Sequence, residues 1–276
     1  MYQADLEQMA KATEKKCEFA EQSLGSYLVS SSLAGAYLGF GIGLILTLGA
    51  PLATGDSPFT KLVMGDTFGI ALTLVIFAGA ELFTGNNMLG VIGALSGQVS
   101  WGRVLNLWLW CYVGNLLGSL LLAWLLAQSG LFGSAQQLAF IDRVVAAKMN
   151  APLWQLFVRG ILANWLVCLA VWMAMRAKSE SAKLVLIFWC LLGFIAPGFE
   201  HSIANMSSLG LGLLLPHGEA VSWWGYLRNL GIVTLGNIVG GGFFVGGLYW
   251  LVSPLRAPQV AEVAEPLGQP LGAVAR

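Results

Sequence analysis

The chain has 276 residues, of which 10% are charged and 57% are hydrophobic, and its 14 basic residues balance its 14 acidic residues. A soluble globular domain carries about 25% charged residues, so this composition excludes most soluble folds and indicates a protein embedded in the lipid bilayer. The zero net charge also excludes the basic surface that nucleic-acid binding requires.

In chain order, the first predicted element is a charged amphipathic helix within residues 1–26, which we expect on the cytoplasmic side. Four later segments each contain the roughly 20 apolar residues that cross about 30 Å of hydrocarbon. They are residues 27–49, 104–126, 156–175 and 230–252. Residues 253–276 include several Pro and Ala residues, and we interpret them as a disordered cytoplasmic tail. Residues 27–252 are therefore predicted to form one six-span domain.

Two further apolar regions, residues 64–98 and 184–215, are too long for a single span, and polar residues interrupt each of them. The first interruption runs from Glu81 to Asn87 and the second from Glu200 to Asn205. Each region is therefore predicted to form two half-helices that meet inside the membrane. Broken helices of this kind are typical of transport sites.

An internal repeat supports this interpretation. The pattern G-x-E-x-x-x-x-N begins at Gly79 and again at Gly198, and G-N-x-x-G begins at Gly114 and again at Gly236. Two matches in the same order, at offsets of 119 and 122 residues, indicate one three-span unit used twice. Because three spans is an odd number, the second copy enters from the opposite side. The sequence thus predicts an all-α membrane protein with inverted repeats at about 27–130 and 152–252.

The positions of the basic residues predict the orientation of the chain, because cytoplasmic loops carry an excess of Lys and Arg. With six crossings and the N-terminus inside, nine basic residues fall on the cytoplasmic side and five outside. The nine are Lys11, Lys15, Lys16, Arg103, Arg176, Lys178, Lys183, Arg256 and Arg276, and the five are Lys61, Arg143, Lys148, Arg159 and Arg228. Both termini are therefore expected in the cytoplasm.

The breaks carry the residues that could bind a ligand. Half-helix N-termini present partial positive charge, so an anion is the natural guest, and the hydroxyls of Thr84 and Ser202 could donate hydrogen bonds to it. His201 is notable because an ionisable side chain at membrane depth costs about 2.5–3.5 kcal/mol. Two interpretations stay open: His201 exchanges a proton near neutral pH, or it is a neutral imidazole that holds the loop.

Glu81 and Glu200 occupy matched positions in the repeat, each followed five residues later by Asn86 or Asn205. This matching favours a role in supporting the half-helix loops over direct contact with a substrate.

The run G-F-E-H-S-I-A-N-M at 198–206, together with E-L-F-T-G at 81–85, resembles the formate/nitrite transporter family over residues 27–252. Residues 63–76, 164–170 and 233–237 look most like its nitrite channel branch. The resemblance implies an aquaporin-like bundle of six helices with the second and fifth broken. It also implies a homopentamer in the bacterial cytoplasmic (inner) membrane in which each protomer conducts.

The resemblance also implies roles for single residues. It makes His201 the central pore histidine, Thr84 the hydroxyl that faces it, and Asn164 and Lys148 polar residues of the pore and its outer vestibule. Phe68 and Phe194 then match the outer constriction. The inner constriction is matched by Leu72, Leu82, Phe83 and Val167.

The function implied is movement of nitrite, with formate or hydrosulfide as the alternative substrates. A charged anion does not cross two apolar constrictions readily, so one mechanism has His201 donate a proton and the neutral weak acid pass. The other has the hydrated anion pass while His201 sets selectivity only.

Two other classes of protein are less consistent with the residues. An aquaporin-type neutral-solute channel would carry Asn-Pro-Ala tripeptides at its loops, and none occurs. A membrane-embedded redox enzyme would carry paired histidines or clustered cysteines, whereas the chain has two histidines and four widely spaced cysteines. We therefore predict a protein that is not an enzyme, with no cofactor and no metal site.

Overall fold

The structure is a computed structural model that describes residues 2–255, and every regular element in this part of the chain is helical. The expected tail lies outside the described residues from position 256 onward. Within residues 2–255, five stretches are long and apolar enough to cross a membrane. They are α2 (Leu24–Thr54), the run Thr60–Gly79, α6 (Trp101–Gln128), α8 (Leu153–Arg176) and the run Trp223–Val252. The four spans predicted as continuous are thus confirmed, each a few residues longer than expected.

The two broken regions are also observed. The run Thr60–Gly79 consists of α3 (Thr60–Thr67), α4 (Gly69–Thr73) and the π-helical η1 (Leu74–Gly79), and α5 (Phe83–Leu95) follows the break. The second region consists of α9 (Glu180–Ile195) and α10 (Ser202–Leu214). Gly79 and Gly198 adopt φ angles of 81° and 86° at the two breaks, a conformation that glycine adopts without steric cost. The chain turns between half-helices at these residues.

The last span is assembled from α11 (Trp223–Ile238), the π-helical η2 (Val239–Gly247) and α12 (Leu248–Val252). It packs along α8, as α6 packs along α2. A Cβ atom on Gly118 of α6 would collide with the backbone oxygen of Ser32, and one on Gly240 would collide with that of Ile161. The repeated G-N-x-x-G pattern therefore allows both helix pairs to approach closely, as small residues do in membrane bundles.

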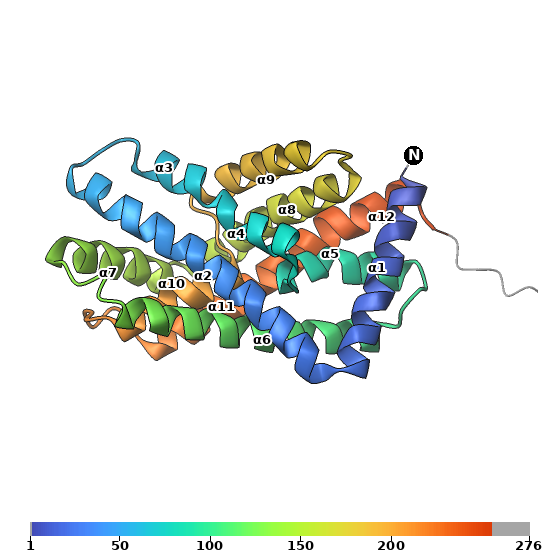
Figure 1. The fold of residues 1–276 in the computed structure, drawn as a ribbon, viewed down its shortest axis with the longest axis horizontal. Helices are drawn as coiled ribbons and strands as arrows, with labels where there is room; N and C mark the ends of the chain where they lie inside the picture. Colours follow the sequence, from blue (N-terminus) through green and yellow to red (C-terminus); the bar gives the residue numbers. More distant parts are fainter. Residues whose placement is uncertain (1, 256–276) are drawn as a thin grey trace, which may run out of the picture.

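Two amphipathic helices complete the fold, α1 (Gln3–Gln22) and α7 (Ala135–Asn150), and they lie at opposite ends of the long axis (Figure 1). The N-terminal helix is in the segment where the sequence predicts it. Helix α7 is not predicted from the sequence, although Ser134 and Gln137 form a capping box at its start. Its buried residues, Phe140, Ile141, Val145 and Met149, follow the helical period.

Candidate pore and vestibules

Two asparagines hold the backbone at the two breaks in the same way. The side chain of Asn115 accepts a hydrogen bond from Phe83 N (2.9 Å) and donates to the backbone oxygens of Glu81 (2.8 Å) and Ser31 (2.7 Å). Without the Asn115 side chain, these backbone N–H and C=O groups would have no hydrogen-bond partner, which is costly inside a membrane. The sequence shows Asn115 as part of a repeat but gives no sign of what it binds.

Asn237 repeats the arrangement at the second break. Its Oδ1 accepts from Ser202 N (2.8 Å), and its Nδ2 donates to the backbone oxygens of Glu200 (3.0 Å) and Gly160 (2.8 Å). The internal repeat therefore extends beyond sequence patterns to matched hydrogen bonds.

The two repeat-related carboxylates each connect a break to an amphipathic helix. Glu81 accepts from Asn86 Nδ2 (3.1 Å) and forms an ion pair with Lys16 of α1. This is the geometry that a loop-supporting role requires, because the carboxylate joins the chain before the break to the half-helix after it.

At the second break, Glu200 Oε2 accepts from Asn205 Nδ2 (2.6 Å) and from Lys148 Nζ of α7 (2.9 Å). Lys148 also donates to Asn205 Oδ1 (3.2 Å). The correspondence of Lys16 with Lys148 makes α7 the counterpart of α1, so the repeat includes the two amphipathic helices as well as the spans.

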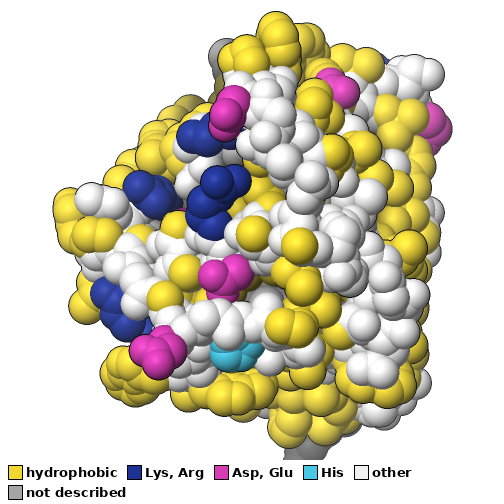
Figure 2. Space-filling model, turned by 90° about the vertical axis from the view of Figure 1, so that its left-hand side faces the viewer, with side chains coloured by type: hydrophobic (Ala, Val, Ile, Leu, Met, Phe, Trp, Pro, Cys, Tyr) yellow, Lys and Arg dark blue, Asp and Glu magenta, His cyan; other side chains and the backbone are white. Residues whose placement is uncertain are grey.

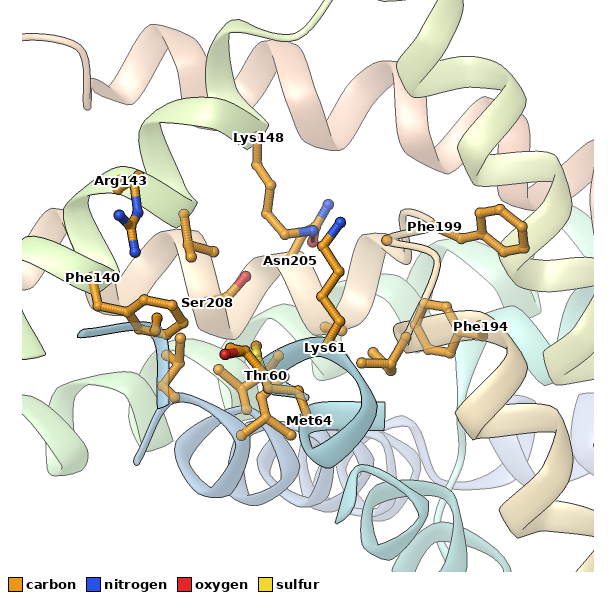
Figure 3. Close-up of a pocket in the computed structure, with 18 of the residues that line it drawn as sticks. Thr60, Lys61, Met64, Phe140, Arg143, Lys148, Phe194, Phe199, Asn205 and Ser208 are labelled. Carbon is orange, nitrogen blue, oxygen red and sulfur yellow. Dashed lines mark hydrogen bonds between the residues drawn. The ribbon is translucent and has the colours of Figure 1, made fainter. Parts of the chain in front are cut away.

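A cavity of about 560 Å³, which we call the α7 vestibule, opens between α2, α3, α7, α9 and α10 (Figure 3). Its polar lining includes Lys61, Arg143, Lys148 and Asn205, and its inner lining includes Phe194 and His201. Lys and Arg side chains gather on the end of the molecule that carries α7 (Figure 2).

A second cavity, the α1 vestibule, has a volume of about 370 Å³ and is lined by Lys16, Glu81, Leu72 and Leu82, among others. Between the two vestibules lies a small central cavity of about 10 Å³. Its lining includes Phe68, Leu72, Leu82, Val167, Phe194 and His201.

The three cavities follow one another through the molecule. Phe194 and His201 line both the α7 vestibule and the central cavity, and Leu72 and Leu82 line both the central cavity and the α1 vestibule. Polar vestibules are thus separated by a narrow apolar segment that contains one imidazole. The arrangement suits a small solute that enters from one end and leaves at the other.

His201 is positioned by the start of α10. The residue is 3% exposed, and Nδ1 accepts a hydrogen bond from Ala204 N (3.2 Å), so His201 caps the half-helix. The ring centroid lies 5.7 Å from that of Phe194. A neutral imidazole that accepts at Nδ1 carries its proton on Nε2, which leaves an N–H donor for a ligand.

Comparison with known proteins identifies the family to which this architecture belongs. A family model described as "Formate/nitrite transporter" matches residues 3–251. The chain belongs to the formate/nitrite transporter family. It is 46% identical to the nitrite transporter NirC of Escherichia coli (strain K12), over 88% of this chain and 89% of that one. It is 34% identical to the formate channel FocA of the same strain, over 76% and 81%.

Solved structures agree with the fold. An "FNT family ion channel" superposes with a TM-score of 0.85 at 42% identity, covering 91% of this chain and 99% of that chain. A "Pentameric formate channel with formate bound" gives a TM-score of 0.73 at 29% identity, covering 84% and 98%. The predicted family and the all-α, multi-pass membrane fold are therefore confirmed, and these relatives are transporters and channels by name.

Several residues that the family resemblance assigns to the pore contact other parts of the protein. The backbone oxygen of Thr84 accepts from Asn164 Nδ2 (3.1 Å), and its buried hydroxyl has no partner among the described residues. Asn164 Nδ2 also contacts Asn237 O (2.7 Å), and the Phe83 ring packs edge-to-face on Tyr112 with centroids 5.0 Å apart. Thr84, Asn164 and Phe83 are absent from the described residues that line the three cavities.

Proposed function

We propose that the chain conducts nitrite across the bacterial cytoplasmic membrane. The observation that supports this most strongly is the route through three successive cavities, with His201 at its narrow part. Identity to the nitrite transporter, 46%, exceeds the 34% identity to the formate channel, which favours nitrite over formate as the substrate. Hydrosulfide is a further candidate of similar size and charge.

The size of the central cavity bears on the form in which the substrate crosses. A volume of about 10 Å³ holds roughly one water molecule. A nitrite ion entering it would lose its hydration shell among apolar side chains, and an unpaired buried charge is far more costly than a neutral polar group. We therefore propose that nitrite crosses the narrow segment as the neutral acid, accompanied by a proton.

The source of that proton is constrained by the cap on α10. To donate the Nε2 proton without becoming an imidazolate, His201 would first have to gain a proton on Nδ1. An N–H at Nδ1 would then face the N–H of Ala204, and the capping hydrogen bond would be lost. This geometry favours His201 as a hydrogen-bond donor, with the proton entering from the vestibule. A proton relay through His201 is the second candidate, and it requires the ring to leave α10.

Nitrite conduction is tested by flux into proteoliposomes, with formate and hydrosulfide as competitors across a pH series. The expected result is nitrite uptake well above that of empty liposomes. Half-inhibition of this uptake is expected to need a higher concentration of added formate or hydrosulfide than of added nitrite. Absence of nitrite uptake would contradict the proposal. Faster formate uptake at equal concentration would replace nitrite by formate as the substrate.

The two roles of His201 are separated by His201→Asn, because Asn is also a good N-cap and a hydrogen-bond donor. Nitrite flux and proton movement are measured together. The donor role predicts reduced flux with an unchanged ratio of protons to nitrite. A relay predicts that the ratio falls.

Orientation and assembly are part of the same proposal. The excess of basic residues supports cytoplasmic termini, which puts α1 and its vestibule inside and the α7 vestibule outside. The solved pentameric formate channel, at 29% identity, supports a homopentamer.

A further inference from the structure

We propose that Gly241 of η2 is a positioning residue for solute selection, because the space left by its missing side chain holds the Asn164 amide that ties the two breaks together. The spacing of the breaks then limits the size of the solute that passes the narrow segment. That solutes cross this segment rests on the proposed function, whereas the role of Gly241 is argued from contacts and hydrogen bonds.

The Asn164 side chain, on α8, connects the two breaks. Its Nδ2 donates to Thr84 O (3.1 Å) and Asn87 Oδ1 (3.1 Å) on α5, the half-helix after the first break. It also donates to Asn237 O (2.7 Å), and Asn237 Oδ1 in turn accepts from Ser202 N at the second break. Two N–H groups are thus shared among three acceptors. We call the Asn164 amide and its three acceptors the amide clamp.

Gly241 leaves the space that the amide clamp occupies. A Cβ atom at this position would lie 2.6 Å from Asn164 Nδ2, 2.6 Å from Cys168 Sγ and 3.3 Å from Asn87 Cβ. A separation under 3.0 Å forces one of the two atoms to move. Because Asn164 is fully buried and its amide is held by three acceptors, moving it would leave buried polar groups without partners, which is costly.

The amide clamp occurs in one half of the repeat. Gly35 and Gly160 correspond, since a Cβ on either would meet a backbone oxygen of the neighbouring span. Asn164 stands four residues after Gly160, whereas the matching residue after Gly35 is Gly39. Gly241 lies in the π-helical η2, although the part of α6 that follows the same G-N-x-x-G pattern is α-helical, and π-helical turns are frequent at functional sites. The first half packs without such a clamp, so helix packing alone does not require it.

The amide clamp fixes the spacing across the narrow segment. Leu82 directly precedes α5, His201 directly precedes α10, and both line the central cavity. Asn164 joins α5 to α11, whose Asn237 holds the start of α10. In a cavity of about 10 Å³, a small shift of one break relative to the other changes which solute fits. Gly241 acts on the solute only through the Asn164 amide.

The clamp is tested by uptake of nitrite, formate and acetate into proteoliposomes that contain the full chain. The quantity compared is the ratio of acetate uptake to that of nitrite or formate, whichever the unchanged chain takes up faster. Gly241→Ala displaces the amide and Asn164→Ala removes it, so each is expected to raise this ratio about tenfold, as loss of discrimination against one methyl group would. A smaller amount of folded protein lowers both uptakes alike and leaves the ratio unchanged.

The matched control is Gly231→Ala, at an exposed position of α11 where a Cβ would meet no atom of the described residues within 4 Å. It is expected to keep the ratio of the unchanged chain. A double variant, Asn164→Ala with Gly241→Ala, tests whether Gly241 acts through Asn164. Both steps are made in a Cys168→Ala background, since the added Cβ would also meet Sγ. Because no amide is left to displace, the double variant is expected to match Asn164→Ala alone.

Three results would overturn the clamp: an unchanged ratio in Asn164→Ala, equal ratios in Gly241→Ala and Gly231→Ala, or a further rise in the double variant. The same uptake data separate this inference from the proposed function. The expected ratios, obtained with formate but without nitrite uptake, would retain the clamp and refute nitrite conduction. Nitrite uptake with unaltered ratios would do the reverse, and no uptake of any of the three solutes by the unchanged chain would refute both.

Discussion

At the scale of single residues, side-chain amides replace the backbone hydrogen bonds that the helices lose at each break. Asn115 and Asn237 each satisfy one backbone N–H and two backbone oxygens. Both asparagines are fully buried. Because water does not reach these groups in the bilayer, the two amides hold the half-helix ends that border the narrow segment.

Asn237→Ala removes all three of these hydrogen bonds at the second break. Each buried group left without a partner costs about 1–3 kcal/mol, so we expect a clear fall in the unfolding temperature of the protein in detergent. Thermal unfolding followed by circular dichroism measures it. Asn115→Ala is expected to behave alike, whereas Asn106→Ala, at an exposed position on α6, is the matched control. Equal unfolding temperatures for Asn237→Ala and Asn106→Ala would refute the role of Asn237.

The sequence identifies these residues only in part, and the reason is physical. Glu81, Glu200 and His201 are visible because a polar residue in an apolar run is rare and costly. The partners of Asn115 and Asn237 come from residues more than 30 positions away. Such tertiary contacts leave no local signal beyond the repeat itself.

At the scale of elements, α1 and α7 act as braces that bring a lysine to the carboxylate at each break. The N-terminal helix is further attached at both ends, since Asp5 pairs with Arg176 (3.0 Å) and Glu21 pairs with Arg103 (2.7 Å). On its buried face lie Leu6, Met9, Ala10, Thr13, Cys17 and Ala20. The attachment of α1 therefore combines apolar burial with ion pairs at its ends.

The Glu21–Arg103 pair makes this attachment sensitive to acid. Hydrogen bonds from the Arg103 guanidinium lower the pKa of the Glu21 carboxyl below its ordinary value of 4.5. A lowered pKa means that the pair stabilises the attached helix above pH 4.5 and ceases to do so as the pH falls through the lowered value. Because the side chains of Arg103 and Glu21 are 33% and 42% exposed, the ion pair contributes less than about 1 kcal/mol to the attachment of the helix.

We therefore expect Glu21→Gln to increase hydrogen exchange of residues 3–22 slightly near neutral pH and to reduce its acid dependence. Hydrogen-exchange mass spectrometry at pH values above and below 4.5 measures both effects. Glu18→Gln, at an exposed position on the same helix, serves as the control. An unaltered acid dependence in Glu21→Gln would show that the pair does not hold α1.

The sequence predicts the long helices better than the short ones. Long apolar spans were predicted because length and hydropathy determine them. The helix α7 was not, since a short amphipathic helix resembles a polar loop in composition, and its capping box was the available signal. The presence of Lys61 and Arg143 in the same cavity as Lys148 was likewise not predicted, because it depends on how α3 and α7 approach each other.

At the scale of the whole molecule, the inverted repeat produces one vestibule at each end and a narrow segment where the two breaks meet. The same repeat explains why the lining is symmetric in its Lys–Glu–Asn contacts. His201 is the exception, since the matching position after Glu81 is Leu82. One imidazole therefore serves a pore that is otherwise built from paired elements.

The proposed pentamer has a direct physical expectation. Large hydrophobic side chains on α6, including Leu105, Leu109, Leu117 and Leu121, are exposed in the single chain. They face lipid or a neighbouring copy. Native mass spectrometry of the detergent-extracted protein is expected to give five times the mass of one chain. A dominant monomer under conditions that preserve nitrite flux would contradict the pentamer.

The central claim is that the substrate passes between the vestibules through the segment lined by His201, Leu72 and Leu82. The most direct test is nitrite flux through Leu82→Cys before and after reaction with a cationic methanethiosulfonate reagent, because Leu82 also lines the α1 vestibule. The account predicts normal flux before labelling, loss of most of the flux after it, and recovery with dithiothreitol, with the unchanged chain unaffected by the reagent. Undiminished nitrite flux at complete labelling of Cys at position 82 would contradict it.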